Sequence, residues 1–467
     1  MADGGTPTYP YIPNSAPETR AAMLDAIGVK SVEDLYASIP LELRFDGPLP
    51  LPDPFVAEQD LRRHVEELLA ANEAFPAHRS FLGGGCWRHV VPAVCDEIAS
   101  RSEFLTAYGG SAYANRGVFQ AQFEYQSLMG ELVGMDLVGS PTYDWGTAAA
   151  SALLMASRAT GRDHVVVPRT MSPTRRSQVR AATRAVLSVS DAAFDPRTGS
   201  LDLDHLEDLV SEATAAIYVE VPAYLGFVEP AVTQIAEIAH RAAALFVVGV
   251  DPSSLGVLEA PAAYGADLVC GELQPLGIRP HAGGGLAGFL AAPDREPYRS
   301  AYPSLLVSIL PTVRGGEHGF DWVNFETVSY GLRESSRDFT GTTQVLWSIV
   351  AAVYLSVMGP EGMRDLGEAI LRRTSYAAET LSRIPGVTGS RFDAVNFKEF
   401  VVSFDVDGPL RRVDQVNAAL RRRGILGGTD LTRGFPELGE SALFCVTEVH
   451  TKQDIDDLAA ALAEAVP

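Results

Sequence analysis

The sequence predicts an α/β protein with a large domain built on a mostly parallel sheet, a smaller α+β domain after it and a helical arm before it. Three observations predict this. The middle of the 467-residue chain alternates short, continuous apolar runs with helical patterns, which is typical of parallel strands buried on both faces. The first residues are rich in proline and glycine, and the pattern changes at about residue 345. We therefore expect an arm over 1–60, a large domain over 61–340 and a small domain over 341–467.

The arm carries the signals of two short helices and an extended connector. The run Asn14-Ser15-Ala16-Pro17-Glu18 offers an N-cap, a proline and an acid for a first turn, and Gly28 ends the predicted helix after Ile27. A second short helix is expected from Ser31. The proline-rich residues 48–54 must be extended. We expect this arm to pack on another surface.

Helices and strands alternate through the two domains. In the large domain the predicted helices cover 59–72, 119–135, 147–159 and 232–244, and the predicted strands cover 164–168, 215–221 and 245–250. In the small domain the predicted helices cover 345–357, 363–384, 413–422 and 454–465, and the predicted strands cover 400–404 and 443–446. The helices carry apolar residues at helical spacing, and the strands are continuous apolar runs.

Charge and cysteine content exclude several classes of protein. There are 59 acidic and 37 basic residues, so the net charge is -22, whereas a protein that binds a phosphate backbone needs a positive surface. Four widely spaced cysteines suit a reducing compartment. The N-terminus lacks the basic start and apolar stretch of a signal peptide, and the apolar runs are too short to span a membrane. We expect a soluble, cytoplasmic protein without nucleic-acid or membrane partners.

Signals for a nucleotide or metal site are weak. Residues 283–288 fit G-x-G-x-x-G, but the dinucleotide fingerprint needs a strand before it and a helix after it. Here a loop precedes the glycines, and Phe289-Leu290-Ala291 resembles a strand. We therefore expect a glycine loop lying beside another backbone. The nine histidines form no pair at metal-ligand spacing on one helix, so we expect no metal site.

Three places in the large domain form a more informative constellation. Gly146-Thr147-Ala148 opens a helix after a loop, where backbone N–H groups and a hydroxyl bind phosphates. Asp251 follows the strand 245–250, at the carboxyl end where ligands bind in open α/β sheets, although it could simply cap the next turn. Gln274 follows the next strand. Aminotransferase-type pyridoxal-phosphate enzymes carry at these places a phosphate cradle, an acid for the ring nitrogen and the Schiff-base lysine.

The third place lacks the required amine. Gln274 stands 23 residues after Asp251, and an amide nitrogen is not a usable nucleophile. The chain has three lysines, each more than a hundred residues away in sequence: Lys30, Lys398 and Lys452. We therefore expect no Schiff base on this chain. The predicted vestigial cofactor pocket consists of Thr147, Ala148, Asp251 and Gln274.

At these residues the chain resembles the α subunit (subunit 1) of the two-subunit glycine dehydrogenase (decarboxylating), the P-protein of the glycine cleavage system. The resemblance extends from about Tyr9 to the C-terminus. The stretches that carry it are Tyr11-Ile12-Pro13, Phe81-Leu82-Gly83-Gly84-Gly85, Val91-Pro92-Ala93-Val94, Ser100-Arg101-Ser102-Glu103-Phe104-Leu105-Thr106-Ala107-Tyr108, Tyr143-Asp144 with Thr147-Ala148-Ala149, Gly249-Val250-Asp251-Pro252, Gly271-Glu272 with Gln274-Pro275-Leu276-Gly277, and Cys445-Val446-Thr447-Glu448.

This resemblance implies an aminotransferase-like fold, the fold type I of pyridoxal-phosphate enzymes, and a heterotetramer in which a homologous β subunit carries the cofactor on its lysine. The family reaction decarboxylates glycine and passes the aminomethyl group to the lipoyl arm of a carrier protein. In dimers of this fold the pocket lies between subunits, so we expect this chain to complete the β subunit's site. The candidate residues are Tyr108, Tyr113, Asn115 and Arg116, for which ordinary interface contacts are an equal alternative.

Two segments depart from the family pattern. The run after Tyr108, residues 109–117, is one residue shorter than usual, and residues 337–342 replace a basic stretch. Both segments lie where the family would face substrate or partner. Two alternatives stay open: a paralogue that uses another amino acid or carrier in specialised metabolism, and a non-catalytic scaffold subunit. Non-covalent binding of the cofactor through Thr147 and Asp251 is a third alternative. A nicotinamide-dependent dehydrogenase is the weakest, because it rests only on the glycine loop.

Overall fold

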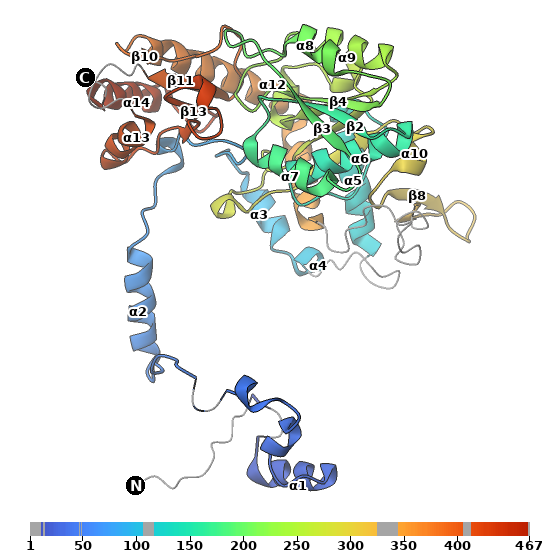
Figure 1. The fold of residues 1–467 in the computed structure, drawn as a ribbon, viewed down its shortest axis with the longest axis vertical. Helices are drawn as coiled ribbons and strands as arrows, with labels where there is room; N and C mark the ends of the chain where they lie inside the picture. Colours follow the sequence, from blue (N-terminus) through green and yellow to red (C-terminus); the bar gives the residue numbers. More distant parts are fainter. Residues whose placement is uncertain are drawn as a thin grey trace. The chain divides into compact units, whose positions relative to one another are not determined.

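The computed structural model describes residues 11–12, 15–45, 47, 49–105, 116–324, 344–404 and 412–465. The chain divides into two compact units, Met1–Glu73 and Ala74–Pro467, and Figure 1 labels many of their helices and strands. The second unit contains two separate sheets, a large one and a smaller one near the C-terminus. The division into three domains stays a prediction.

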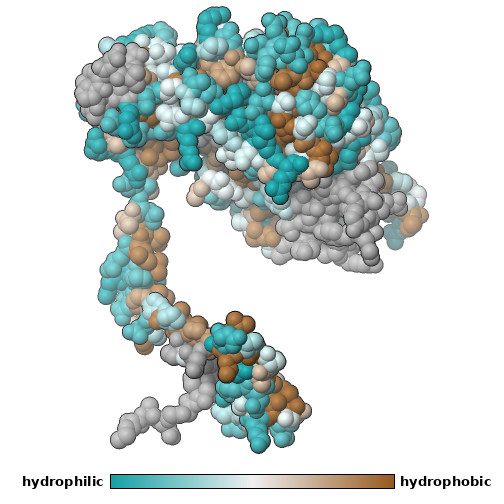
Figure 2. All heavy atoms as spheres, viewed as in Figure 1, coloured by the Kyte–Doolittle hydropathy of each residue, from teal (hydrophilic) through white to brown (hydrophobic). Residues whose placement is uncertain are grey.

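The first unit consists of short helices that bury no residue in its described part. Its elements are α1 (Pro17–Ile27), η1 (Glu33–Tyr36), η2 (Leu41–Leu43) and α2 (Glu58–Ala70). Gly28 ends α1 as predicted, with a left-handed φ of 83°. The N-cap is Ala16, which makes no side-chain hydrogen bond, so the predicted polar cap was wrong. The apolar side chains of α2 are exposed, and Figure 2 shows hydrophobic residues along this unit; in α2 they are Leu61, Val65, Leu68 and Leu69.

The second unit is built around a seven-stranded sheet with the order β1-β7-β6-β5-β4-β2-β3. Its strands are β1 (Leu137–Val138), β2 (His164–Pro168), β3 (Ser188–Ala192), β4 (Thr214–Val221), β5 (Leu245–Val250), β6 (Leu268–Glu272) and β7 (Gly288–Ala292). The neighbours from β3 through β2, β4 and β5 to β6 are parallel, whereas β7 is antiparallel to both β6 and β1. The predicted mostly parallel sheet is therefore confirmed.

Helices cover both faces of this sheet (Figure 1). Successive residues of a strand point to opposite faces, and both faces are buried here. Ile217 and Phe246 pack in one core with α5 (Arg116–Val133), α9 (Val232–Arg241) and α12 (Val345–Ser382). Tyr218 and Val247 pack in a second core with α6 (Trp145–Thr160) and α10 (Tyr298–Ala301). This two-sided burial explains why the strands are apolar throughout.

The remaining elements of the large part of this unit are short helices and one hairpin. The α-helices are α3 (Ala93–Ala99), α4 (Ser102–Leu105), α5 (Arg116–Val133), α6 (Trp145–Thr160), α7 (Pro173–Thr183), α8 (Leu203–Leu209), α9 (Val232–Arg241) and α10 (Tyr298–Ala301). The 3-10 helices are η3 (Ala77–Arg79), η4 (Pro252–Gly256), η5 (Pro261–Tyr264) and η6 (His281–Gly283), and the hairpin is β8 (Val307–Pro311) with β9 (His318–Trp322).

The C-terminal part has the predicted α+β character. Its antiparallel sheet has the order β10-β11-β13-β12, with β10 (Val387–Thr388), β11 (Glu399–Phe404), β12 (Thr429–Asp430) and β13 (Ser441–Cys445). Two helices, α13 (Val413–Arg422) and α14 (Lys452–Ala465), accompany it, with η8 (Pro436–Leu438) between strands. Phe400 and Phe444 from the sheet pack with Leu420 of α13 and Leu458 of α14 in one core.

The long helix α12 (Val345–Ser382) joins the two parts. It breaks at Gly359, where φ is 59° and ψ is -179°, and Pro360 follows, as the two predicted helices require. Among the described helices it alone is long and apolar enough to cross a membrane, which by itself is weak evidence for a span. Val350 and Ile370 are buried in the main core, on either side of the break, so packing accounts for the apolar character of α12.

Candidate functional site

The carboxyl edge of the large sheet gathers the residues that the sequence singles out. Asp251 directly follows β5, and Gln274 follows β6. The amino end of α6 is bonded to the same edge, because the Trp145 N–H donates a hydrogen bond to Glu272, the last residue of β6. The segment 81–92 and the start of β11 close over this edge, since Trp87 bonds Gln274 and Lys398 reaches Asp251.

Asp251 forms a buried ion pair with Lys398. The Lys398 Nζ lies 2.5 Å from Oδ2 of Asp251, and the two side chains are 1% and 7% exposed. The other carboxylate oxygen, Oδ1, accepts hydrogen bonds from the backbone N–H of Ser253 at 3.0 Å and from its hydroxyl at 2.7 Å. Asp251 therefore caps η4, as the alternative reading of this residue expects, and holds the Lys398 ammonium at the same time.

Lys398 is held in place from several sides. Its ammonium lies 4.3 Å from the centre of the Trp87 ring, a cation–π contact. Its backbone has a φ of 63°, a left-handed conformation that costs a non-glycine residue about 1–2 kcal/mol. Its carbonyl accepts a hydrogen bond from Val446 N–H at 2.8 Å, and the preceding Phe397 N–H donates to the Gly226 carbonyl at 2.9 Å. This backbone frame fixes the side chain in its position across the sheet edge.

Two carboxylates of the chain itself occupy the amino end of α6. Asp144 is the N-cap, and its Oδ1 accepts from the Thr147 N–H at 2.7 Å and from the Thr147 hydroxyl at 2.8 Å. The Ala148 N–H bonds the Asp144 carbonyl at 3.0 Å. The Trp145 N–H bonds Oε2 of Glu272 at 3.2 Å. The donors of the predicted phosphate cradle at Thr147 and Ala148 are therefore already engaged.

Two buried glutamates at this edge are shifted toward the protonated form. Burial raises the pKa of Glu272 to about 8, even though backbone N–H groups, including that of Ala287 at 2.7 Å, donate to it. Burial also raises the pKa of Glu399 to about 7, against the opposing effect of the Gly84 N–H, which lies 2.5 Å from its Oε1. Desolvation penalises the charged form of each carboxyl group more than these donors stabilise it.

Gln274 makes a structural bridge at the place where the fold would carry the lysine. Its Nε2 donates to the carbonyls of Trp87 at 2.9 Å and Ile278 at 2.8 Å, and its Oε1 accepts from the Trp87 N–H at 2.9 Å. The amide is 1% exposed. A lysine could not replace the bond from the Trp87 N–H, because an ammonium has no acceptor.

A second buried ion pair lies beside the first. Arg175 of α7 binds Glu220 of β4 in bidentate fashion, with distances of 2.8 and 2.7 Å. The guanidinium stacks over Trp145 at 4.1 Å, and the Trp145 Nε1 donates to the Tyr218 hydroxyl at 3.0 Å. The Tyr218 hydroxyl in turn donates to Glu220 at 3.2 Å.

This cluster leaves almost no free space. Lys398, Asp251, Trp87, Trp145 and Arg175 are among the residues that line a cavity of about 10 Å³, which is about the space that one water molecule needs. Pyridoxal phosphate does not fit here. The acid that would bind its ring nitrogen is paired with Lys398, and the helix end that would bind its phosphate is capped by carboxylates.

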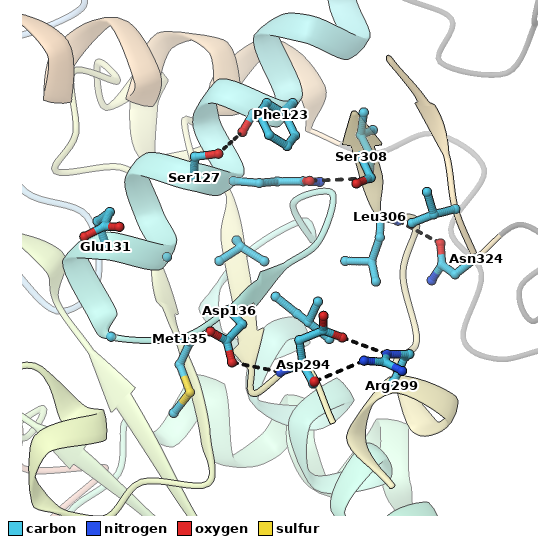
Figure 3. Close-up of a pocket in the computed structure, with 17 residues that line it drawn as sticks. Phe123, Ser127, Glu131, Met135, Asp136, Asp294, Arg299, Leu306, Ser308 and Asn324 are labelled. Carbon is cyan, nitrogen blue, oxygen red and sulfur yellow. Dashed lines mark hydrogen bonds and ion pairs between the residues drawn. The ribbon is translucent and has the colours of Figure 1, made fainter. Parts of the chain in front are cut away.

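A larger cavity, of about 730 Å³, lies at the opposite edge of the sheet. It is bounded by α5, β1 and the hairpin β8–β9, and Figure 3 shows Asp136, Asp294 and Arg299 along one side. Asp294 follows the antiparallel strand β7, which places this cavity at the amino edge of the parallel strands. It shares no lining residue with the Lys398 cluster.

The four residues predicted to complete a partner's site stay predictions. Tyr108, Tyr113 and Asn115 lie outside the described residues. Arg116 is the first residue of α5, and its side chain is not described. Both segments that depart from the family pattern also fall largely outside the described residues.

The glycine loop at residues 283–288 contacts another part of the backbone, as the sequence predicts. η6 precedes it and β7 follows it directly, so the strand and helix of a dinucleotide fingerprint are both missing at this place. Gly288 lies beside another backbone, since Thr142 N–H donates to its carbonyl at 2.8 Å and its own N–H donates to the Thr142 carbonyl at 3.1 Å.

Sequence reasoning missed Lys398 as a pocket residue, because separation along the chain hid its nearness to Asp251. It also missed Trp87, Arg175 and Glu220. One usable signal was present: Glu220 is an acid inside an otherwise apolar buried strand, and buried acids require a partner. The scarcity of lysine was a second signal. Lys398 is one of three lysines in the sequence, and it directly precedes the apolar strand β11.

The chain is similar over nearly its full length to known proteins. The family model "Glycine cleavage system P-protein" matches residues 9–462. A probable glycine dehydrogenase (decarboxylating) subunit 1 from Thermococcus onnurineus is 38% identical, covering 97% of this chain and 99% of the relative. The protein of the same description from Staphylothermus marinus is 36% identical, covering 98% of each chain.

Solved structures agree with this similarity. A glycine decarboxylase (P-protein) of the glycine cleavage system, in inhibitor-bound form, aligns with a TM-score of 0.83 and 34% identity over 98% of this chain and 100% of that chain. A glutamate decarboxylase from Lactobacillus brevis, with a TM-score of 0.68 and 12% identity over 91% of this chain and 96% of its own, shares the fold. The predicted aminotransferase-like fold is thus confirmed. The chain belongs to the glycine cleavage system P-protein family.

Proposed function

We propose that this chain is the α subunit (subunit 1) of a heteromeric glycine dehydrogenase (decarboxylating) and works with a homologous β-type subunit. Relatives of this description match the chain over nearly their whole length. The family reaction releases the carboxyl group of glycine and passes the aminomethyl group to the lipoyl arm of a carrier protein. We take glycine as the substrate, a lipoyl protein as the carrier and the cytoplasm as the location.

The observation that carries this proposal is the filled pocket at the sheet edge. Lys398 neutralises Asp251, Gln274 holds Trp87, and the end of α6 is capped from within. A member of the family with no room for pyridoxal phosphate has to work through a partner that binds it. The cofactor, when bound to the β-type subunit's lysine, acts there as an electron sink.

The contribution of this chain is then a fixed wall of the partner's site, that is, a set of side chains held in place on one side of the substrate. Tyr108, Tyr113, Asn115 and Arg116 are the residues we propose to face that site, where they orient the substrate and exclude water. Arg116 opens α5, whose Tyr125 and Met129 are buried in the main core, so α5 is a rigid support for the residues before it.

The test is a co-expressed pair of this chain and its β-type neighbour. We expect release of carbon dioxide from carboxyl-labelled glycine only when both subunits and a lipoyl carrier are present. Arg116→Ala, Tyr108→Phe and Tyr113→Phe should each lower kcat/KM for glycine about tenfold or more, since positioned polar groups contribute that much to a transition state. Arg372→Ala, at an exposed position of α12, is the matched control and should leave the rate unchanged.

The same experiment separates the alternatives. Full activity of all three variants in an intact complex would favour a scaffold subunit and would contradict the proposed wall. A complex that ignores glycine and turns over another small amino acid would favour a paralogue in specialised metabolism. Complex integrity, measured by size-exclusion chromatography, ensures that a lost rate does not merely reflect lost assembly.

A further inference from the structure

The Lys398–Asp251 pair has properties that neither packing nor capping requires. A cap for η4 needs only an acceptor, and Asp251 supplies it through Oδ1 alone. Its second oxygen is left to face the pocket, where it meets the Lys398 ammonium. Two charges so deeply buried lose their hydration, and such a pair is rarely more stabilising than apolar side chains of the same size.

The backbone at Lys398 indicates that the side chain is required in this place. Its φ of 63° would suit glycine better than lysine. Residues in such conformations cluster at functional sites. Among the described residues the other non-glycine examples are Ala243, His281 and Ala282, and of them all Lys398 is the one that is buried in an ion pair. Here the strained residue directly precedes β11 and places an ammonium at the end of β5, in the other sheet.

The ammonium also lacks the partners that a purely structural lysine would have. Apart from the ion pair with Asp251, its Nζ has no hydrogen-bond acceptor among the described residues, and its remaining contact is the face of the Trp87 ring. An anion, an aromatic face and apolar walls are the elements of a site that binds an organic cation. Phe397 and Pro222 supply the apolar part of the lining, which also includes Arg175 and Glu399.

We propose that the pocket at Asp251 is a binding site for a primary alkylammonium ion and that the chain fills it permanently with its own Lys398. The side chain acts as a tethered ligand that holds β11 against the large sheet and excludes free cations. Replacing Lys398 by glycine should open a site whose matching ligand is n-butylammonium. This ion has the four carbons and the amine of the lost lysine side chain. The inference holds whether or not the chain serves as a subunit of a decarboxylase.

The first experiment uses the full-length chain with Lys398→Gly. We expect its melting temperature to lie about 5 °C below wild type, because a buried pair loses one partner. Titration with n-butylammonium chloride should raise the melting temperature of this variant in a saturable way. The amine is added during refolding as well as to folded protein, so that access does not limit binding. Equal concentrations of sodium chloride and of n-butanol, the neutral analogue, should have no comparable effect.

A second set of variants keeps the inference testable if Lys398→Gly does not fold. Lys398→Met retains the length and removes the charge, and Asp251→Asn removes the anion. Each single variant should be destabilised against chemical denaturant, and the double variant should lose clearly less than the two singles combined. The double variant Lys398→Gly/Asp251→Asn should not respond to n-butylammonium.

Three results would overturn the inference. One is a Lys398→Gly variant as stable as wild type, which would mean that the ion pair stabilises the fold no more than relief of the backbone strain does. Another is a response to n-butylammonium that wild type or the double variant shares. The third is additive losses in the Lys398→Met and Asp251→Asn cycle, which would show that the two groups do not act together.

Discussion

At the scale of single residues, Gln274 and Lys398 are the two departures from what the sequence analysis expects of an aminotransferase-type site. An amide stands after β6, and an ammonium stands at the acid after β5. The Gln274 amide forms three hydrogen bonds with backbone groups, two of them with Trp87, so it holds the segment that contains Trp87 in place. The missing lysine after β6 was predictable from the sequence. The lysine at Asp251 was not, because it comes from another sheet and no local pattern links the two.

Gln274→Ala should destabilise the chain by about 2–4 kcal/mol, because buried groups of Trp87 and Ile278 lose their partners. Denaturant unfolding measures the difference. The matched control is Gln120→Ala on α5, an exposed glutamine whose amide bonds Glu124 in the next turn; its effect should stay within about 0.5 kcal/mol. Equal effects at the two positions would mean that the Gln274 bridge does not stabilise the fold.

At the scale of elements, the sequence predicted best the strands that are buried continuously and a helix whose buried apolar residues follow helical spacing. β2, β5 and α13 begin and end at the predicted residues. The strand β3 was missed because it is a polar edge strand, and β8 and β9 because their hairpin is largely exposed. Exposed strands lack the apolar periodicity on which prediction depends.

The break in α12 is fixed by glycine. Gly359 has φ of 59° and ψ of -179°, a region that other residues essentially do not adopt, and a Cβ there would meet no neighbour. Gly359→Ala should therefore lower the free energy of unfolding by about 1–3 kcal/mol through backbone strain alone. Gly117→Ala is the control, since that glycine lies in α5 with open space around it; it should be neutral or stabilise by up to about 1 kcal/mol. Thermal unfolding of both variants checks the opposite signs.

At the scale of the whole molecule, buried charge rather than a cavity occupies the carboxyl edge of the large sheet. Two ion pairs and two protonatable glutamates fill the place where the sheet would hold a ligand. The sequence predicted the place through Asp251 and Thr147. It could not predict how the place is filled, because the filling groups come from α7, β4, the segment around Trp87 and the start of β11. Their meeting is a property of the tertiary fold.

The buried glutamates make stability depend on pH. The pKa of Glu272 is raised to about 8 and that of Glu399 to about 7, from 4.5. A raised pKa in the folded state means that the folded chain binds more protons, so this contribution is full below pH 4.5 and is lost as pH rises to 7 or 8. Each group adds a slope of at most about 1.4 kcal/mol per pH unit.

Denaturant unfolding from pH 5 to 8.5 measures this dependence. Glu399→Gln should remove that residue's share of the loss, up to about pH 7, and Glu272→Gln its own share, up to about pH 8, because an amide does not titrate. Glu237→Gln, at an exposed position of α9, should leave the wild-type slope unchanged. A wild-type slope preserved in both buried variants would contradict the assignment.

The cofactor content of the purified two-subunit complex tests most directly whether this chain's own pocket is closed to pyridoxal phosphate. One portion of the complex is reduced with borohydride, digested and mapped by mass spectrometry to locate lysine adducts, and the total bound cofactor is counted after its release from an unreduced portion. The filled pocket predicts one group per pair of subunits, on the lysine of the β-type partner, and none on Lys30, Lys398 or Lys452. A second group per pair, or any adduct on Lys398, would contradict it.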